Sequence, residues 1–196
     1  MCGRYALHAN PEVVALQFGL RAVPRFAPRY NIAPASQVLV VKGDGASFAH
    51  WGFRGKTPNL RAETSARRRN RCLMPASGFY EWKRAGAISQ PYYVRPAQGE
   101  LLALAAIWDG DTCAVITTPA NRTMSRIHHR MPVLIDKERY AAWLAGEDGL
   151  LETPADESIV AYPVSAAVNR AANDSPELIA PAPSAIGGTG ELFGEV

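Results

Sequence analysis

The most reactive candidate residue is a cysteine that directly follows the first methionine. If Met1 is removed, Cys2 carries an α-amine and a thiol whose ordinary pKa values are about 8 and about 8.5. Both groups would then be partly nucleophilic at neutral pH. Such a 1,2-aminothiol can attack an acyl group through sulfur. Alternatively, its amine condenses with an aldehyde and its thiol closes a five-membered thiazolidine, an intramolecular step with a high effective molarity.

A carboxylate and two adjacent histidines are the candidates for proton transfer. Glu81 lies in the sequence GFYEW at 78–82, where a strand places Phe79 and Glu81 on one face and two further aromatic residues on the other. Aromatic groups on both faces indicate burial, which suits a carboxylate for acid/base work near neutral pH. His128 and His129 follow a predicted strand, and their spacing does not choose between them. An edge-strand carboxylate and exposed loop histidines are the alternative interpretations.

Basic residues are concentrated in the first half of the chain. Residues 1–100 carry 15 Lys and Arg against 5 Asp and Glu, whereas residues 101–196 carry 6 against 13. The densest basic group consists of Arg61, Arg67, Arg68, Arg69 and Arg71. Because guanidinium groups match phosphate geometry, one interpretation is a site for nucleic acid or another polyanion. The other interpretation is a solvated loop or helix surface.

Length and composition exclude several classes of protein. The chain has 196 residues, of which 47% are hydrophobic and 20% charged, as is typical of one globular domain with a sizeable core. No apolar stretch reaches the roughly 18 residues that cross a bilayer, and no export signal is recognisable. Cys2, Cys72 and Cys113 do not form a disulfide framework or a metal-binding spacing. We therefore expect a cytoplasmic protein with no membrane contact, no metal and no other cofactor.

Short strands joined by turns dominate the predicted elements. One helix is predicted over 12–18, between Asn10 and Gly19, and another over 136–145, whereas 21–36 is expected to be an irregular loop. Strands are predicted at 37–41, 47–53, 71–74, 78–82, 91–95, 101–108, 113–118 and 158–164. Since few crossover helices are available, we predict an α+β fold. It is a single domain with a curled, mostly antiparallel, barrel-like sheet and a few peripheral helices.

Several motifs occur together in one order along the chain. They are MCGRY at 1–5, RYNIAP at 29–34, WG at 51–52, NLRAET at 59–64, RCLMPASGFYEWK at 71–83, ITTPAN at 116–121, IHHRMP at 127–132, and PVS and VN at 163–165 and 168–169. With these motifs the chain resembles the SRAP (SOS-response-associated peptidase) proteins, which sense abasic sites in DNA. The resemblance implies an SRAP domain with the SRAP fold over 1–180. It leaves 181–196 as a tail that we expect to be flexible.

The resemblance also implies an activity and the residues that carry it. SRAP domains bind single-stranded DNA in a basic cleft and react with the aldehyde of a ring-opened abasic site, forming a reversible thiazolidine that shields the lesion. They are held to remove their own initiator Met. Carried over position by position, the catalytic residues are Cys2, Asn59, Glu81 and His128. The residues that match positions facing DNA or the lesion are Gly3, Arg4, Asn31, Pro34, Arg61 and Arg130. We expect a monomer that associates with the nucleoid after DNA damage.

Two segments are shorter than in many relatives. The segment between 52 and 59 lacks a longer, Trp-containing insertion that meets DNA near a junction with duplex. The segment 64–71 lacks an expected aromatic residue. We predict that residues 52–56, together with Arg67, Arg68 and Arg69, form a compact substitute for these DNA contacts.

Three other functions remain open on the sequence alone. Cys2-Gly3 also resembles the start of class II glutamine amidotransferases, which predicts an N-terminal-nucleophile amidohydrolase that acts on a small amide. Cys2, His128 and Asn59 could instead form a thiol-protease triad. A non-covalent module that binds single-stranded DNA is the third alternative, and it predicts that Cys2→Ser has no effect.

Overall fold

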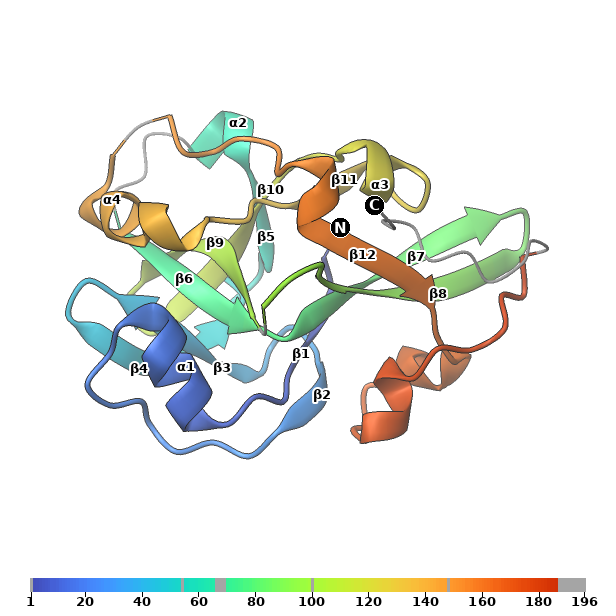
Figure 1. The fold of residues 1–196 in the computed structure, drawn as a ribbon, viewed down its shortest axis with the longest axis horizontal. Helices are drawn as coiled ribbons and strands as arrows, with labels where there is room; N and C mark the ends of the chain where they lie inside the picture. The colour runs from blue at the N-terminus through green and yellow to red at the C-terminus, as the bar shows by residue number, and fades with distance from the viewer. Residues whose placement is uncertain (1, 54, 66–69, 100, 148, 187–196) are drawn as a thin grey trace.

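Two β-sheets carry the fold, and short helices flank them (Figure 1). The computed structural model describes residues 2–53, 55–65, 70–99, 101–147 and 149–186. The predicted basic group Arg67, Arg68 and Arg69 lies outside the described residues, as does most of the tail predicted at 181–196. No helix in the described part of the chain is long and apolar enough to cross a membrane.

The larger sheet closes on itself. Its strands are β3 (Gln37–Lys42), β4 (Gly45–Trp51), β5 (Asn59–Arg61), β6 (Arg71–Ala76), β9 (Leu102–Asp109), β10 (Thr112–Pro119) and β11 (Arg130–Pro132). β9 pairs with β6 on one side and with β10 on the other, and the ladder returns from β10 through β4 and β3 to β6. In this ring only β4 and β10 run parallel. The predicted mostly antiparallel, barrel-like core is therefore confirmed.

The smaller sheet is an open layer of five antiparallel strands, which projects to the right of the barrel in Figure 1. In spatial order the strands are β12 (Ile159–Pro163), β8 (Ile88–Pro96), β7 (Gly78–Ala85), β1 (Arg4–Leu7) and β2 (Arg29–Ile32). β7 follows β6 after a single residue, Ser77, so one stretch of chain joins the two sheets. The prediction of an irregular loop over 21–36 is wrong for β2, because pairing with β1 makes these residues extended.

The helices are short and lie at the edges of the sheets. α1 (Pro11–Phe18) begins one residue before the predicted 12–18 and ends as predicted, because the Asn10 side chain accepts the N–H of Val13 and Gly19 ends the helix at φ 65°. The segment predicted as a helix at 136–145 begins as a 3-10 turn and continues as an α-helix. The remaining helices are α2 (Ala62–Ser65), α3 (Arg122–Ser125), η1 (Lys137–Arg139), α4 (Tyr140–Ala145), η2 (Asp156–Ser158), η3 (Ala166–Asn169) and η4 (Pro176–Ile179).

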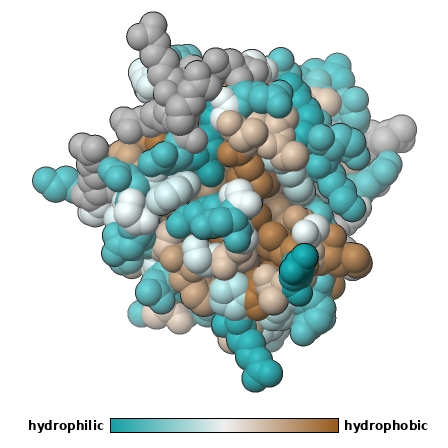
Figure 2. Space-filling view, turned by 90° about the vertical axis from the view of Figure 1, so that its left-hand side faces the viewer, coloured by the Kyte–Doolittle hydropathy of each residue, from teal (hydrophilic) through white to brown (hydrophobic). Residues whose placement is uncertain are grey.

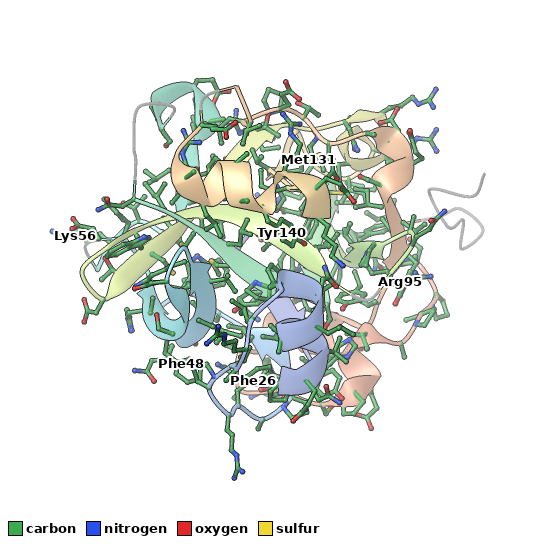
Figure 3. All side chains as sticks on the ribbon, turned by 60° about the vertical axis from the view of Figure 1, so that its left-hand side comes forward. Phe26, Phe48, Lys56, Arg95, Met131 and Tyr140 are labelled. Carbon is green, nitrogen blue, oxygen red and sulfur yellow. The ribbon has the colours of Figure 1, made fainter. Side chains whose placement is uncertain are left out.

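Tyr140 joins α4 to α1 (Figure 3). Its ring stacks on that of Phe18 with 4.9 Å between the centroids, and the Gln17 amide donates to its hydroxyl at 3.2 Å. A cavity of about 530 Å³ opens beside this contact, and Leu16 in its lining is 81% exposed. Figure 2 faces this side of the molecule and shows apolar surface in a hollow between polar borders. The two helices thus cover one side of the barrel without closing it completely.

β7 separates two hydrophobic cores. Phe79 faces the large core of the barrel, to which Trp51 also belongs. Tyr80 faces the other way and packs against Tyr93 in a smaller core under the C-terminal segment, with ring centroids 5.0 Å apart. Both faces of β7 are therefore buried, as the aromatic residues of this strand predict, and Glu81 is only 2% exposed.

Gly78 begins β7 at a position where no side chain fits. A Cβ atom there would lie 2.4 Å from the ring of Tyr93 and 2.5 Å from the carbonyl oxygen of Val94. We expect Gly78→Ala to lower the free energy of unfolding by about 1–3 kcal/mol, because a buried ring and the backbone would both have to move. Urea unfolding measures this change, and Gly43→Ala, where the added Cβ meets nothing within 4 Å, is the control. An unchanged midpoint for Gly78→Ala would contradict the packing described here.

Candidate functional site

A cleft of about 870 Å³ opens beside the start of β1. Four parts of the chain form its walls: the N-terminal residues, the β7–β8 hairpin, the end of α3 with the segment that follows it, and the last residue of η3. The lining residues are Gly3, Arg4, Glu81, Trp82, Arg84, Ser89, Ser125, Ile127, His128, His129 and Asn169. Two arginines face one carboxylate, and the two histidines add positive charge when protonated. The cleft therefore favours an anionic ligand.

Cys2 lies behind this cleft and is completely buried. Its Sγ lies 3.9 Å from the carbonyl oxygen of Arg4. Burial raises the pKa of the Cys2 thiol far above its ordinary value, and the negative charge of Glu81 raises it further. Burial thus favours the protonated thiol, and the expectation of a partly ionised thiol after removal of Met1 stays a prediction. A nearby base must accept its proton before sulfur can act as a nucleophile.

Asn59 holds the N-terminal segment in place from β5. Its Nδ2 donates to the carbonyl oxygen of Cys2 at 2.8 Å. β5 itself is fixed by parallel pairing with β10, in which Asn59 lies opposite Val115. The Oδ1 atom of Asn59 is buried and has no hydrogen-bond partner among the described residues. A buried acceptor of this kind can bind an N–H or O–H group that arrives during a reaction.

Glu81 and His128 share the cleft and influence one another electrostatically. Burial lowers the pKa of His128, and the charge of Glu81 opposes this shift without cancelling it. The backbone N–H of Arg130 donates to Nδ1 of His128 at 3.0 Å, which places the proton of the neutral ring on Nε2. When the ring is protonated, Nδ1 can instead donate to the carbonyl oxygen of Arg130, 3.1 Å away. His128 therefore keeps one orientation in both protonation states, which suits a proton carrier.

The structure distinguishes the two adjacent histidines that the sequence could not. His128 is half-buried and anchored by backbone groups, whereas His129 is exposed and stacks on it with ring centroids 4.3 Å apart. A fixed imidazole next to a carboxylate is better placed for directed proton transfer than an exposed one. The geometry thus favours His128, the residue that the family resemblance selects.

Arg4 and Asn31 form a network at the edge of the cleft. The Nη1 of Arg4 donates to Oδ1 of Asn31 at 2.8 Å and to the carbonyl oxygen of Val168 at 2.7 Å. The Asn31 amide donates to the carbonyl oxygens of Val168, Arg170 and Asn173 at 3.1, 3.1 and 2.8 Å. Asn31 is 1% exposed, so it holds the C-terminal segment against β2. The Asn31 side chain is thus occupied by protein groups in this structure, and its contact with DNA stays a prediction.

The other predicted DNA-facing residues are dispersed. Gly3 and Arg4 line the cleft, and Arg61 is exposed at the end of β5. Arg130 is 6% exposed, and its guanidinium is bound by Glu63, so its side chain does not face solvent as expected. Pro34 is partly buried in the loop before β3. As far as the described residues show, neither Pro34 nor Arg130 belongs to the cleft lining.

Several lining residues, among them Trp82, Arg84 and Asn169, were not among the predicted site residues. Trp82 and Arg84 extend along the cleft from the open end of β7, and the indole Nε1 of Trp82 donates to Oδ1 of Asn169 at 2.7 Å. The VN motif at 168–169 was a signal for Asn169, whereas no local pattern shows that Arg84 reaches the cleft. No group of three or more His, Cys, Asp or Glu within the described residues could hold a metal ion.

These features define a class: barrel proteins with a buried cysteine near the N-terminus, directly before a cleft that holds a carboxylate and an anchored imidazole. The chain belongs to the SRAP family, described as SOS response associated peptidase, whose sequence model matches residues 1–171.

Known proteins resemble the chain in both sequence and structure. It is 31% identical over 221 residues to the abasic site processing protein YoqW of Bacillus subtilis (strain 168), with 91% of this chain and 99% of YoqW covered. It is 34% identical over 170 residues to the abasic site processing protein HMCES of Gallus gallus, with 64% and 50% covered. A crystal structure of a Bacteroides thetaiotaomicron protein has a TM-score of 0.83 at 22% identity, covering 92% of this chain and 100% of that one. This last likeness shows the fold alone.

Proposed function

We propose that this protein processes abasic sites in single-stranded DNA and traps them covalently through Cys2 after removal of Met1. Relatives of similar length are named abasic site processing proteins. The observation that carries the proposal is the surroundings of Cys2. Asn59 binds its carbonyl oxygen at 2.8 Å, and the charge of Glu81 acts on its thiol.

The first step exposes the α-amine. Hydrolysis of the Met1–Cys2 peptide bond consumes one water, releases methionine and leaves Cys2 with a free amine and a thiol. Glu81 and His128 are the groups in the cleft that can move protons to and from the attacking water and the leaving nitrogen. The protein would thus act once on itself before it acts on DNA.

The second step joins the protein to the lesion. The amine nitrogen attacks the aldehyde carbon of the ring-opened abasic sugar, and loss of one water gives a Schiff base. Sulfur then bonds to the same carbon, the C=N electron pair moves to nitrogen, and the thiol proton is transferred to that nitrogen. Because burial favours the protonated thiol, a base must mediate this transfer. His128 suits the task, since burial favours its neutral form.

The shape and charge of the cleft support a single strand as substrate. Chemistry on a nucleotide requires that it leave the base stack, which a single strand allows at little cost. Arg4 and Arg84 line the cleft and can attract phosphates independently of base sequence. A lesion without a base needs no base recognition, so the cleft requires only phosphate contacts and access to Cys2.

Incubation with an oligonucleotide that bears one abasic site tests the proposal. A denaturing gel should show a shifted band, and intact mass spectrometry should give the mass of the protein without Met1 plus the DNA minus one water. An undamaged strand of the same sequence is the control. Failure to form the adduct, with a free Cys2 amine confirmed by mass, would overturn the proposal. Retained binding in that case would indicate a non-covalent DNA-binding module instead.

A further inference from the structure

An ion pair connects the two chain segments that carry Asn59 and His128. The Arg130 guanidinium binds both carboxylate oxygens of Glu63, with Nη1–Oε1 2.8 Å and Nη2–Oε2 3.0 Å. Glu63 lies in α2, directly after β5 and Asn59, whereas Arg130 begins β11 two residues after His128. Arg130 therefore contacts both segments. Its side chain binds Glu63 in α2, and its backbone N–H donates to the His128 ring.

The pair bridges across β10. Thr117 in β10 pairs with Arg61 of β5 and with Pro132 of β11, so these two strands lie on opposite sides of it. The Nη2 atom of Arg130 also donates to the carbonyl oxygen of Thr117 at 2.6 Å. β5 and β11 have three residues each, so few ladder hydrogen bonds fix them. A side-chain bridge over β10 adds a constraint that these short strands cannot supply.

We propose that Glu63 is a positioning residue for the site: by binding Arg130, it fixes the backbone N–H that orients His128 and keeps His128 in place relative to Asn59. The proposal rests on the cross-linking function proposed above. It concerns a residue outside the cleft, which would act on the reaction only through Arg130.

Glu63 can fix the position of Arg130 because the Arg130 side chain is buried. The Arg130 side chain is 8% exposed, and its Nε has no hydrogen-bond partner among the described residues. Such a buried cation needs a charged neighbour. Hydrogen bonds from Arg130 hold the pKa of Glu63 at about 2, so the carboxylate is ionised at all pH values where the protein would work. Without Glu63, we expect the guanidinium to move toward water and to shift the backbone that binds His128.

NMR of the histidine rings tests the proposal without relying on DNA chemistry. In the wild type, ¹⁵N shifts should show His128 as the Nε2–H tautomer with a pKa below its ordinary value of 6.5. In Glu63→Ala, His128 should populate both tautomers and its pKa should move. The rate of adduct formation should fall about 10-fold, by analogy with the loss seen when the outer hydrogen bonds that orient a metal-binding histidine are removed. Affinity for an undamaged strand should not fall, since no cation of the cleft is removed.

Two further variants distinguish the loss of the Glu63–Arg130 contact from unfolding and from a general change of charge. Glu63→Gln preserves the shape and one acceptor for Arg130, so it should fold and give an intermediate effect on both readouts. Glu12→Gln makes the same charge change on the exposed surface of α1 and should behave as the wild type. Unchanged His128 shifts and an unchanged rate in Glu63→Ala would overturn the proposal. If the His128 shifts change but even the wild type forms no adduct, the positioning role stands and the cross-linking function fails.

Discussion

Cys2→Ala should abolish the stable adduct with an abasic-site strand. The α-amine remains after removal of Met1, but no sulfur is present to close the ring, so the reaction stops at a reversible Schiff base. The loss should be complete on a denaturing gel, because an open Schiff base hydrolyses. Alanine fits the buried space that Cys2 leaves, and the thiol makes only a weak 3.9 Å contact with a backbone carbonyl. Non-covalent binding of an undamaged strand should therefore persist.

Borohydride reduction separates the role of the amine from that of the thiol. Reduction should trap Cys2→Ala on the abasic strand, because it converts the Schiff base into a stable amine. Cys72→Ala is the matched control, since Cys72 is equally buried but lies in β6, within the hydrophobic core of the barrel. It should form the adduct as the wild type does. A stable adduct of Cys2→Ala without borohydride would assign the nucleophile to another residue.

The sequence predicts those parts of the fold that are encoded locally. The cap residues of α1, Asn10 and Gly19, lie directly beside the helix that they define, and the helix forms between them as predicted. β2 was missed because its extended form depends on pairing with β1, more than 20 residues earlier in the chain. β5 and α2 were missed for the same reason, since β5 is a strand only through its pairing with β10.

The candidate site, like the fold, could be predicted from the sequence only in part. Residue type and motif order pointed to Cys2, Glu81 and His128, and in the structure the charge of Glu81 acts on both Cys2 and His128. The same approach could not show whether an arginine faces ligand or protein. Arg130 is neutralised by Glu63, which lies 67 residues away in the sequence. Charge density along a chain therefore overestimates the positive surface available to DNA, because it does not show which cations are already paired.

Glu81→Gln should slow adduct formation by about 10²–10⁴-fold while leaving the fold intact. The amide has the shape of the carboxylate and fits the same buried position in β7, but it cannot accept a proton from the amine or the thiol of Cys2. Single-turnover rates on denaturing gels measure the change. Glu152→Gln is the control, because Glu152 is an exposed acid paired with Arg139 at a distance from the reacting groups. A wild-type rate for Glu81→Gln would exclude this carboxylate from the chemistry.

The pH dependence of the same rate tests the partner of Glu81. A base must be neutral to accept a proton, and burial lowers the pKa of His128 below its ordinary value of 6.5. The wild-type rate should therefore not decline until the pH falls below about 6.5, and it should then drop as His128 becomes protonated. In His128→Gln this acid limb should disappear and the whole profile should lie lower. If the limb survives in His128→Gln, the proton leaves the Cys2 thiol by a route that does not include this ring.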